Sequence, residues 1–222
     1  MNLFWQNTNN VTYNTSFGDH HLTATAVFEA SGAEGRNLKL TGSDLANEFV
    51  GYWNAKNAKT RDGENGYSAE AIVSGLGRIM YNYKGKYMLT GTFRADGSSK
   101  FSKGNRWGYF PSAAVAWRIS SEKFMEKTQN WLDDLKIRAS YGTTGNDLNT
   151  SNKSIGYFQY IERYTTGSSY MFGKGLANGI QTGSMPTTDL TWATSATING
   201  GIDFTLLSNR LSGTIDGFYR KE

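Results

Sequence analysis

Long segments in which apolar and polar side chains strictly alternate constrain this chain more than any other feature. Over residues 107–119, one set of alternate positions includes Trp107, Val115 and Trp117, whereas the intervening residues are mostly small or polar. Because successive side chains of a β-strand point to opposite faces, a period of two predicts a strand with one apolar face. This segment is therefore expected to be a strand whose apolar face carries aromatic rings near both ends.

The same period recurs along the sequence and predicts about eight strands. Many of these segments are rich in β-branched and aromatic residues, which suit a pleated surface. Gly18-Asp19, Lys84-Gly85-Lys86 and Leu207-Ser208-Asn209 separate neighbouring strands by so few residues that we expect tight turns there. The predicted strands cover residues 4–15, 22–30, 67–83, 86–96, 107–119, 135–142, 192–206 and 210–219.

The predicted connections alternate in length, as they do in barrels that carry short turns at one end and long loops at the other. One connection on the short side, 120–133, is an exception: Ser121 is a candidate N-cap, and the apolar Phe124 and Trp131 follow it. This pattern predicts a short surface helix, and a second short helix is expected to begin at Ser43. The long connections, expected at the outer end, are 31–66, 97–106 and 143–189.

The composition excludes several classes of protein. Hydrophobic residues make up 38% of the 222 residues, which is low for a globular core. No run approaches the ~18 apolar residues of a membrane-spanning helix. The sequence has no Cys, so it offers neither disulfides nor thiolate chemistry. The net charge of +4 is scattered without a basic block, so nucleic-acid binding is not expected.

Alternation alone does not separate a membrane barrel from a soluble β-sandwich, whose sheets also have one apolar face. Several predicted strands exceed the ~9 to 11 residues that cross hydrocarbon, and aromatic residues gather near strand ends. Small residues such as Gly91 and Ala139 lie on the apolar face, where a packed core would be left with cavities. We therefore expect an all-β fold: an antiparallel, up-and-down transmembrane β-barrel segment with long outer loops and a short helix in one inner connection.

Three motifs carry a resemblance to a known family. They are KYMLTGTFRADGSSKF at 86–101, NRWGYFPSAAVAWRIS at 105–120 and LKIRASYGTTGN at 135–146. In this order and spacing they resemble the barrel of SusC/RagA-type TonB-linked transporters of the bacterial outer membrane. The likeness extends to the adjoining strands, and it implies that residues 1–222 are part of a barrel domain embedded in outer-membrane lipid.

The resemblance also implies a function and a set of partners. Transporters of this type import bulky nutrients such as glycans or peptides through a plugged barrel, with energy delivered by TonB and a SusD-like surface lipoprotein as a lid. The plug, the TonB-contacting motif, the signal peptide and the remaining strands are expected outside this sequence. Import of this kind needs no bond chemistry, so no catalytic residue, cofactor or metal site is expected.

Two other interpretations stay open on the sequence alone. The chain could be an autonomous small outer-membrane barrel or adhesin with a binding or structural role, or a soluble carbohydrate-binding sandwich. A membrane wall predicts that the apolar faces of the strands are exposed to lipid. A sandwich predicts that the sides carrying Trp117 and Ile137 are pressed together and shielded from solvent.

Two groups of residues are candidates for contact with cargo or partners. Aromatic residues in the longest loop could stack on sugars or dock a partner protein, although the loop could equally fold on itself. Charged residues on the polar face could line a hydrated passage or pair with a plug, or they could be ordinary inward polar residues. The loop candidates are Tyr157, Phe158, Tyr160, Tyr164, Tyr170 and Phe172, and the lumen-facing candidates are Arg94, Asp96, Arg118, Arg138 and Asp203.

Overall fold

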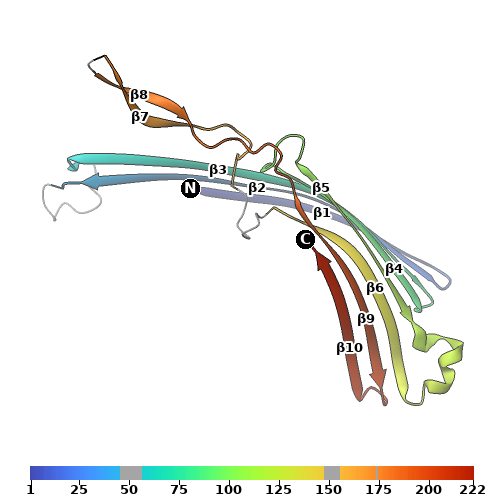
Figure 1. Ribbon diagram of the computed structural model, residues 1–222. Coiled ribbons are helices and arrows are strands. Elements are labelled where there is room, and N and C mark those ends of the chain that lie inside the picture. The colour runs from blue at the N-terminus through green and yellow to red at the C-terminus, as the bar shows by residue number, and fades with distance from the viewer. Residues whose placement is uncertain (46–56, 148–155, 174) are drawn as a thin grey trace.

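The computed structural model describes residues 1–45, 57–147, 156–173 and 175–222, which form one large curved antiparallel sheet and a small separate hairpin (Figure 1). The large sheet has eight strands in the order β1-β2-β3-β4-β5-β6-β9-β10. Strands adjacent in this sheet follow one another along the chain, apart from the hairpin inserted between β6 and β9, so the expected up-and-down topology is confirmed. The strands are β1 (Asn2–Phe17), β2 (His20–Ser43), β3 (Thr60–Tyr83), β4 (Tyr87–Ser98), β5 (Trp107–Arg118), β6 (Leu132–Asn146), β9 (Ala193–Leu206) and β10 (Leu211–Lys221).

Tight turns join the strands at one end of the sheet, as the sequence predicts, and we call this the inner end and the opposite one the outer end. Phe17 pairs directly with His20, which leaves a two-residue turn in which Gly18 has a φ of +59°. The turn between β3 and β4 places Lys84 and Gly85 at positive φ, and Leu207, Ser208 and Asn209 do the same between β9 and β10. Left-handed backbone of this kind reverses the chain within a few residues and fixes the register of each hairpin.

One face of the large sheet is apolar and uncovered. Phe93 is 53% exposed, Trp117 39% and Ile137 42%, and no second sheet packs against them among the described residues. The sandwich interpretation required these side chains to be shielded, so the structure excludes it. A continuous apolar surface of this extent is not tolerated in water but is what hydrocarbon requires.

The opposite face is polar and hollow. A cavity of about 470 Å³ on this face is lined by residues of β3, β4, β5 and β6, including Leu76, Arg94 and Phe110. Among the described residues, the fully buried side chains of Phe101 and Ser98 lie at the outer end of the sheet, and Phe110 nearby is 5% exposed. The sheet therefore has little hydrophobic core of its own, and it separates an apolar face from a polar face.

Strands β2 and β3 are longer than predicted, each running for 24 residues. Much of the predicted 31–66 connection is therefore strand, paired in register from Ser31↔Ile72 to Ser43↔Thr60. The prediction was wrong here because this part of the ribbon is rich in Gly, Asn and charged residues, so the apolar alternation fades while the backbone pairing continues. The hairpin of β7 (Tyr164–Phe172) and β8 (Gly175–Thr182) was also missed inside the predicted 143–189 loop.

The inner connection between β5 and β6, where the sequence predicted a short surface helix, contains two short 3₁₀ helices, η3 (Ile119–Ser121) and η4 (Lys123–Thr128). The N-cap assignment of Ser121 was wrong, because Ser121 lies inside η3 and neither N-cap residue makes a side-chain capping bond. The predicted second helix begins at Ser43, which ends β2, and most of it lies outside the described residues. Among the described residues, no helix is both long and apolar enough to cross a membrane.

Candidate functional site: the polar face and the outer loops

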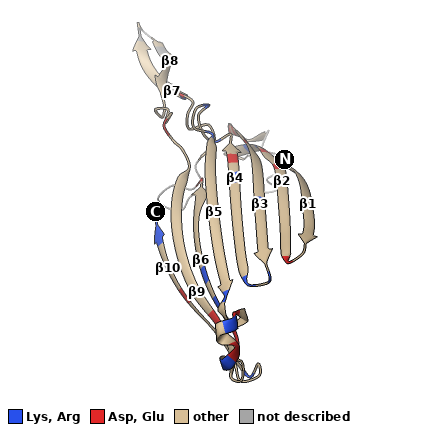
Figure 2. Ribbon diagram, turned by 90° about the vertical axis from the view of Figure 1, so that its right-hand side faces the viewer, with Lys and Arg blue, Asp and Glu red and all other residues tan. Residues whose placement is uncertain are grey.

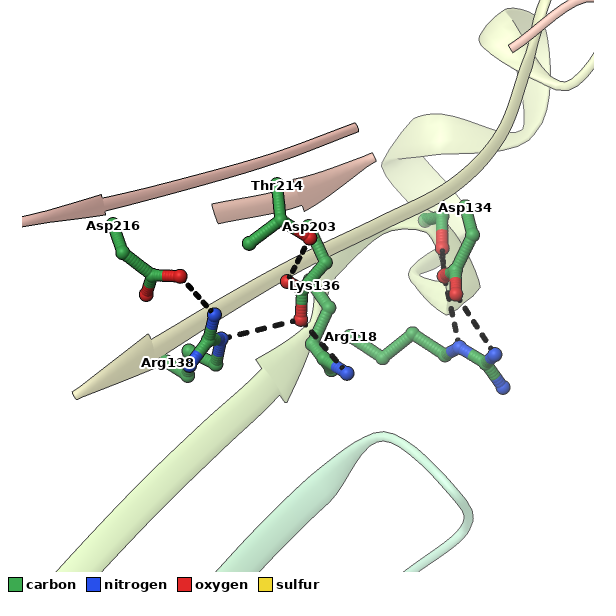
Figure 3. A network of polar contacts seen from close by, with 8 residues as sticks. Arg118, Asp134, Lys136, Arg138, Asp203, Thr214 and Asp216 are labelled. Carbon is green, nitrogen blue, oxygen red and sulfur yellow. Dashed lines mark hydrogen bonds and ion pairs between the residues drawn. The ribbon is translucent and has the colours of Figure 1, made fainter. Parts of the chain in front are cut away.

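Charged side chains on the polar face of β6, β9 and β10 form a continuous network (Figure 3). Asp203 accepts contacts from Lys136 Nζ at 2.9 Å and Arg138 Nε at 3.3 Å, and a hydrogen bond from Thr214 Oγ1 at 3.0 Å. Arg138 also donates to Asp216 on β10 at 2.8 Å. One carboxylate thus ties together three strands, and cross-strand pairs of this kind stabilise the register of a sheet.

Gly201 makes this network possible. It lies between Arg138 and Asp216 in the register of the three strands. A Cβ at position 201 would lie 3.0 Å from the guanidinium carbon of Arg138 and would overlap the carboxylate of Asp216. The absence of a side chain at Gly201 therefore leaves the space in which the guanidinium crosses to the next strand.

A second ion pair lies at the inner end of the polar face. Arg118 Nε and Nη2 each donate to one oxygen of Asp134 at 2.9 Å, and Ser120 Oγ donates to the same carboxylate at 2.8 Å. A two-pronged guanidinium contact of this kind fixes both distance and orientation. It joins the end of β5 to the start of β6 across the inner connection.

The outer end of the polar face holds a third pair, Arg94 and Asp96. Arg94 Nε lies 2.7 Å from Asp96 Oδ2, and Asp96 is only 7% exposed. Both residues line the cavity of about 470 Å³, together with Trp192. The five charged residues predicted to face the lumen thus all lie on the polar face, and each has an oppositely charged partner.

An aromatic cluster that the sequence did not reveal borders the cavity at its outer end, where Phe110 and Trp192 line it. The rings of Phe101 and Phe110 lie 5.3 and 5.7 Å from that of Trp192, whose Nε1 donates to the carbonyl of Arg106 at 2.8 Å. A Cβ at Gly145 would overlap the ring of Phe110. Segments distant in sequence meet here, so alternation within single strands gave no signal for the cluster.

Lys100 is clamped beside this cluster. Its Nζ lies 2.6 Å from Asp147 and 3.1 Å from Glu70, and its side chain is 7% exposed. Desolvation alone would lower the pKa of Lys100, but hydrogen bonds to Asp147 and Glu70 outweigh it and raise the pKa above the ordinary value of 10.5. The lysine therefore stays charged and ties the loop 99–106 to β3 and to the end of β6.

The predicted loop aromatics divide into two groups. Phe158 stacks on Tyr67 of β3 with ring centroids 6.4 Å apart, and with Tyr157 these residues line a cavity of about 470 Å³. Arg163, which the sequence did not single out, also lines it and donates to the carbonyl of Tyr157 at 2.5 Å. Tyr160 is half-buried nearby in sequence but does not line this cavity.

The remaining aromatic candidates lie on the separate hairpin. Tyr164 begins β7 and is 62% exposed, Tyr170 lies within β7 and is 53% exposed, and Phe172 is the last residue of that strand. Met171 and Ile180 on the same hairpin are each 71% exposed. The hairpin thus exposes several large apolar side chains, and it lies beyond the outer end of the large sheet (Figure 1).

The two histidines do not come together. Their backbones are adjacent, but His20 Nδ1 lies 2.6 Å from Tyr81 Oη, whereas His21 Nδ1 lies 2.8 Å from Ser16 Oγ. Within the described part of the chain, no three His, Cys, Asp or Glu side chains gather in a way that could hold a metal ion.

Comparison with known proteins identifies related chains. The family described as TonB dependent receptor-like, beta-barrel matches residues 2–221. TonB-dependent receptor P3 of Formosa agariphila is 32% identical over 209 residues, which is 94% of this chain and 20% of that protein. TonB-dependent receptor SusC of Bacteroides thetaiotaomicron is 38% identical over 168 residues, which is 74% of this chain and 16% of SusC.

The solved structures that resemble this chain include that of the RagAB peptide transporter. It superimposes with a TM-score of 0.83 at 26% identity over 99% of this chain and 23% of the matched chain. The structure of the RagAB peptide importer in the 'open-open' state matches with a TM-score of 0.82. This chain spans about a fifth of the length of the relatives that it matches.

Proposed function

Since the chain belongs to the TonB-dependent receptor β-barrel family of the bacterial outer membrane and is of the SusC/RagA type, we propose that it forms wall and outer loops of an active nutrient importer. The exposed apolar face contacts lipid, and the polar face lines the hydrated interior. The observation that carries this assignment is the separation of the two faces: Val115 and Trp117 are exposed on one, and the ion pairs of Arg94, Arg118 and Arg138 lie on the other.

The open sheet supports the proposal that further strands of the whole protein close the barrel around a plug. Within the described residues, β1 and β10 each have only one neighbouring strand. An unpaired strand edge cannot face lipid, because its N–H and C=O groups would have no partners there. TonB would then deliver energy to the plug through a region outside residues 1–222.

The cargo that we propose is a bulky nutrient, either a glycan or a peptide, taken from a SusD-like surface lipoprotein at the outer end. The exposed hairpin residues Tyr164, Tyr170 and Met171 support a protein contact there, because exposed aromatic and Met side chains are common at interfaces. The cavity beside Tyr67 and Phe158 supports contact with the cargo, because aromatic rings can stack on sugars and on peptide side chains.

Deletion of the whole gene in its native host tests the proposed function. The deletion strain and its parent are supplied with defined oligosaccharides or oligopeptides as sole carbon source, and uptake of each labelled compound is measured with and without TonB. Loss of uptake of one class in the deletion strain, together with loss in the absence of TonB, supports the proposal. Unchanged uptake of every compound would contradict an importing role and leave a structural or adhesive one.

A substitution in the loop cavity tests which residues contact the cargo. Replacing Phe158 by Ala removes the ring that stacks on Tyr67 and is expected to raise the half-saturating cargo concentration about tenfold, equivalent to about 1.4 kcal/mol. Tyr13→Ala on the apolar face of β1 is the matched control. Equal effects of the two substitutions on uptake would argue against a role for this cavity.

A further inference from the structure

A row of paired rings runs along the inner end of the apolar face. Phe17, His20, Tyr83, Tyr87 and Trp117 come from β1, β2, β3, β4 and β5, and each is the direct register partner of the next. Consecutive ring centroids are 5.1, 4.6, 6.2 and 6.4 Å apart. Rings at this position mark the level of the lipid headgroups on a barrel wall. We call these five residues the inner aromatic row.

The row of paired rings ends at β5, and the connection between β5 and β6 begins there. The register partner of Trp117 on β6 is the aliphatic Ile137. Glu122, which lies between η3 and η4, accepts hydrogen bonds from Tyr87 Oη at 2.8 Å and Trp117 Nε1 at 3.3 Å. It also pairs with Lys86 at 3.2 Å. Two rings of the inner aromatic row therefore hold the connecting segment at Glu122, whereas Ser120 at its start bonds to Asp134 on the polar face.

The electrostatics of Glu122 keep this attachment in place at neutral pH. Hydrogen bonds from Tyr87 and Trp117, with a smaller contribution from Lys86, lower the pKa of Glu122 below its ordinary value. The charged carboxylate accepts these bonds more strongly than a neutral acid would. The attachment is therefore retained above the ordinary pKa of a glutamate and lost only as the pH falls through the lowered value.

The attached segment exposes large apolar side chains beside charged ones. Phe124 is 66% and Trp131 52% exposed, and Lys123 and Lys127 are exposed with no ion pair among the described residues. Figure 2 shows the mixed charges of this segment at the inner end of the sheet. A short element with rings and lysines together, continuous with a lipid-facing belt, has the composition of a segment that lies in a membrane interface.

We propose that residues 119–131 form an interfacial anchor, in which Phe124 and Trp131 insert among the phospholipid headgroups of the inner leaflet. The segment continues the inner aromatic row beyond β5, and its lysines lie at the level of the lipid phosphates. The proposal rests on the outer-membrane location of the family and on an orientation with the long loops outward. It does not depend on what the protein imports.

Spin labels in the intact barrel protein, reconstituted in phospholipid nanodiscs, test the anchor. Phe124→Cys and Trp131→Cys each carry one label, and Asp19→Cys in the β1–β2 turn is the control for the same end of the barrel. Labels at positions 124 and 131 are expected to be more accessible to oxygen, which partitions into lipid, than to a water-soluble nickel complex. The label at position 19 is expected to show the reverse order. Nickel accessibility at position 124 equal to that at position 19 overturns the proposal, as does protection from both reagents, which indicates a protein partner instead.

The mobility of the spin label at position 124 also tests the role of Glu122. Glu122→Gln weakens the bonds to Tyr87 and Trp117 and is expected to increase the mobility of the label at position 124. Glu126→Gln, four residues further along the same segment, is the matched control because within the described residues the Glu126 side chain makes no hydrogen bond to a ring of the inner aromatic row. Equal mobility in the two variants would show that Glu122 does not hold the segment in place, and intact cargo uptake in both would separate this result from a failure of import.

Discussion

At the scale of single residues, the polar face is organised by carboxylates that each serve more than one partner. Asp203 contacts Lys136, Arg138 and Thr214, whereas within the described part of these strands the Asp216 side chain is bonded only to Arg138. Exposed ion pairs contribute little singly, but shared ones hold several side chains in one geometry. The sequence predicted the face on which Arg138 and Asp203 lie, but it did not predict their partners. Those depend on the register between strands, which turns and strand pairing set and which the sequence of a single strand does not determine.

Replacing Asp203 by Asn is therefore expected to lower the thermal unfolding temperature of the barrel more than replacing Asp216 by Asn. The first substitution weakens two ion pairs and a hydrogen bond, and the second weakens one ion pair. Heat-dependent loss of β-structure in detergent, followed by circular dichroism, measures the difference. A larger effect of Asp216→Asn would contradict the central position of Asp203.

Lys100 provides a prediction with a defined pH dependence. Its pKa is raised above 10.5 in the folded protein, so the clamp is fully present below the unfolded pKa and is lost as the pH rises through the higher folded value. Hydrogen exchange of the loop 99–106 is expected to keep its protection from neutral pH to about the ordinary lysine pKa. Lys100→Met should remove that protection already at neutral pH, and an unchanged exchange pattern in this variant would show that the clamp is dispensable.

At the scale of elements, the strands of the membrane region were predictable and their outer extensions were not. The bounds of β4, β5 and β9 lie within two residues of the prediction, because lipid on one side and polar surroundings on the other impose a strict period. Beyond the hydrocarbon, β2 and β3 continue as an exposed ribbon in which backbone pairing persists without apolar alternation. The aromatic cluster around Trp192 was invisible for a different reason: Phe101, Phe110 and Trp192 come from separate segments.

Gly145 tests the packing between β5 and β6. Gly145→Ala is expected to destabilise the barrel by about 1 to 3 kcal/mol, because its methyl group would overlap the ring of Phe110 in an already filled space. Gly91→Ala is the matched control, since a Cβ at position 91 meets nothing within 4 Å. Combining Gly145→Ala with Phe110→Leu should recover part of the loss, and additive effects in this double mutant would argue against a direct clash.

At the scale of the whole molecule, the sheet has an apolar side and a polar side. Neighbouring residues of one strand lie on opposite sides, so a shift of one position moves a substitution from one side to the other. Val115→Arg places a cation on the apolar face and is expected to cost about 2 to 4 kcal/mol if it lies near the bilayer midplane. Ala114→Arg, one residue away, points to the polar face and should assemble normally. The measurement is the amount of folded barrel in outer-membrane fractions, and equal yields of the two variants would contradict the assignment of the faces.

The pairing of charges on the polar face has a consequence for what can travel past it. Arg94, Arg118, Lys136 and Arg138 are matched by Asp96, Asp134, Asp203 and Asp216, so four cations meet four carboxylates and these groups cancel. Such a lining is strongly dipolar close to the surface yet has almost no field a Debye length away. This part of the wall is therefore expected to attract neither anions nor cations at distances beyond a Debye length.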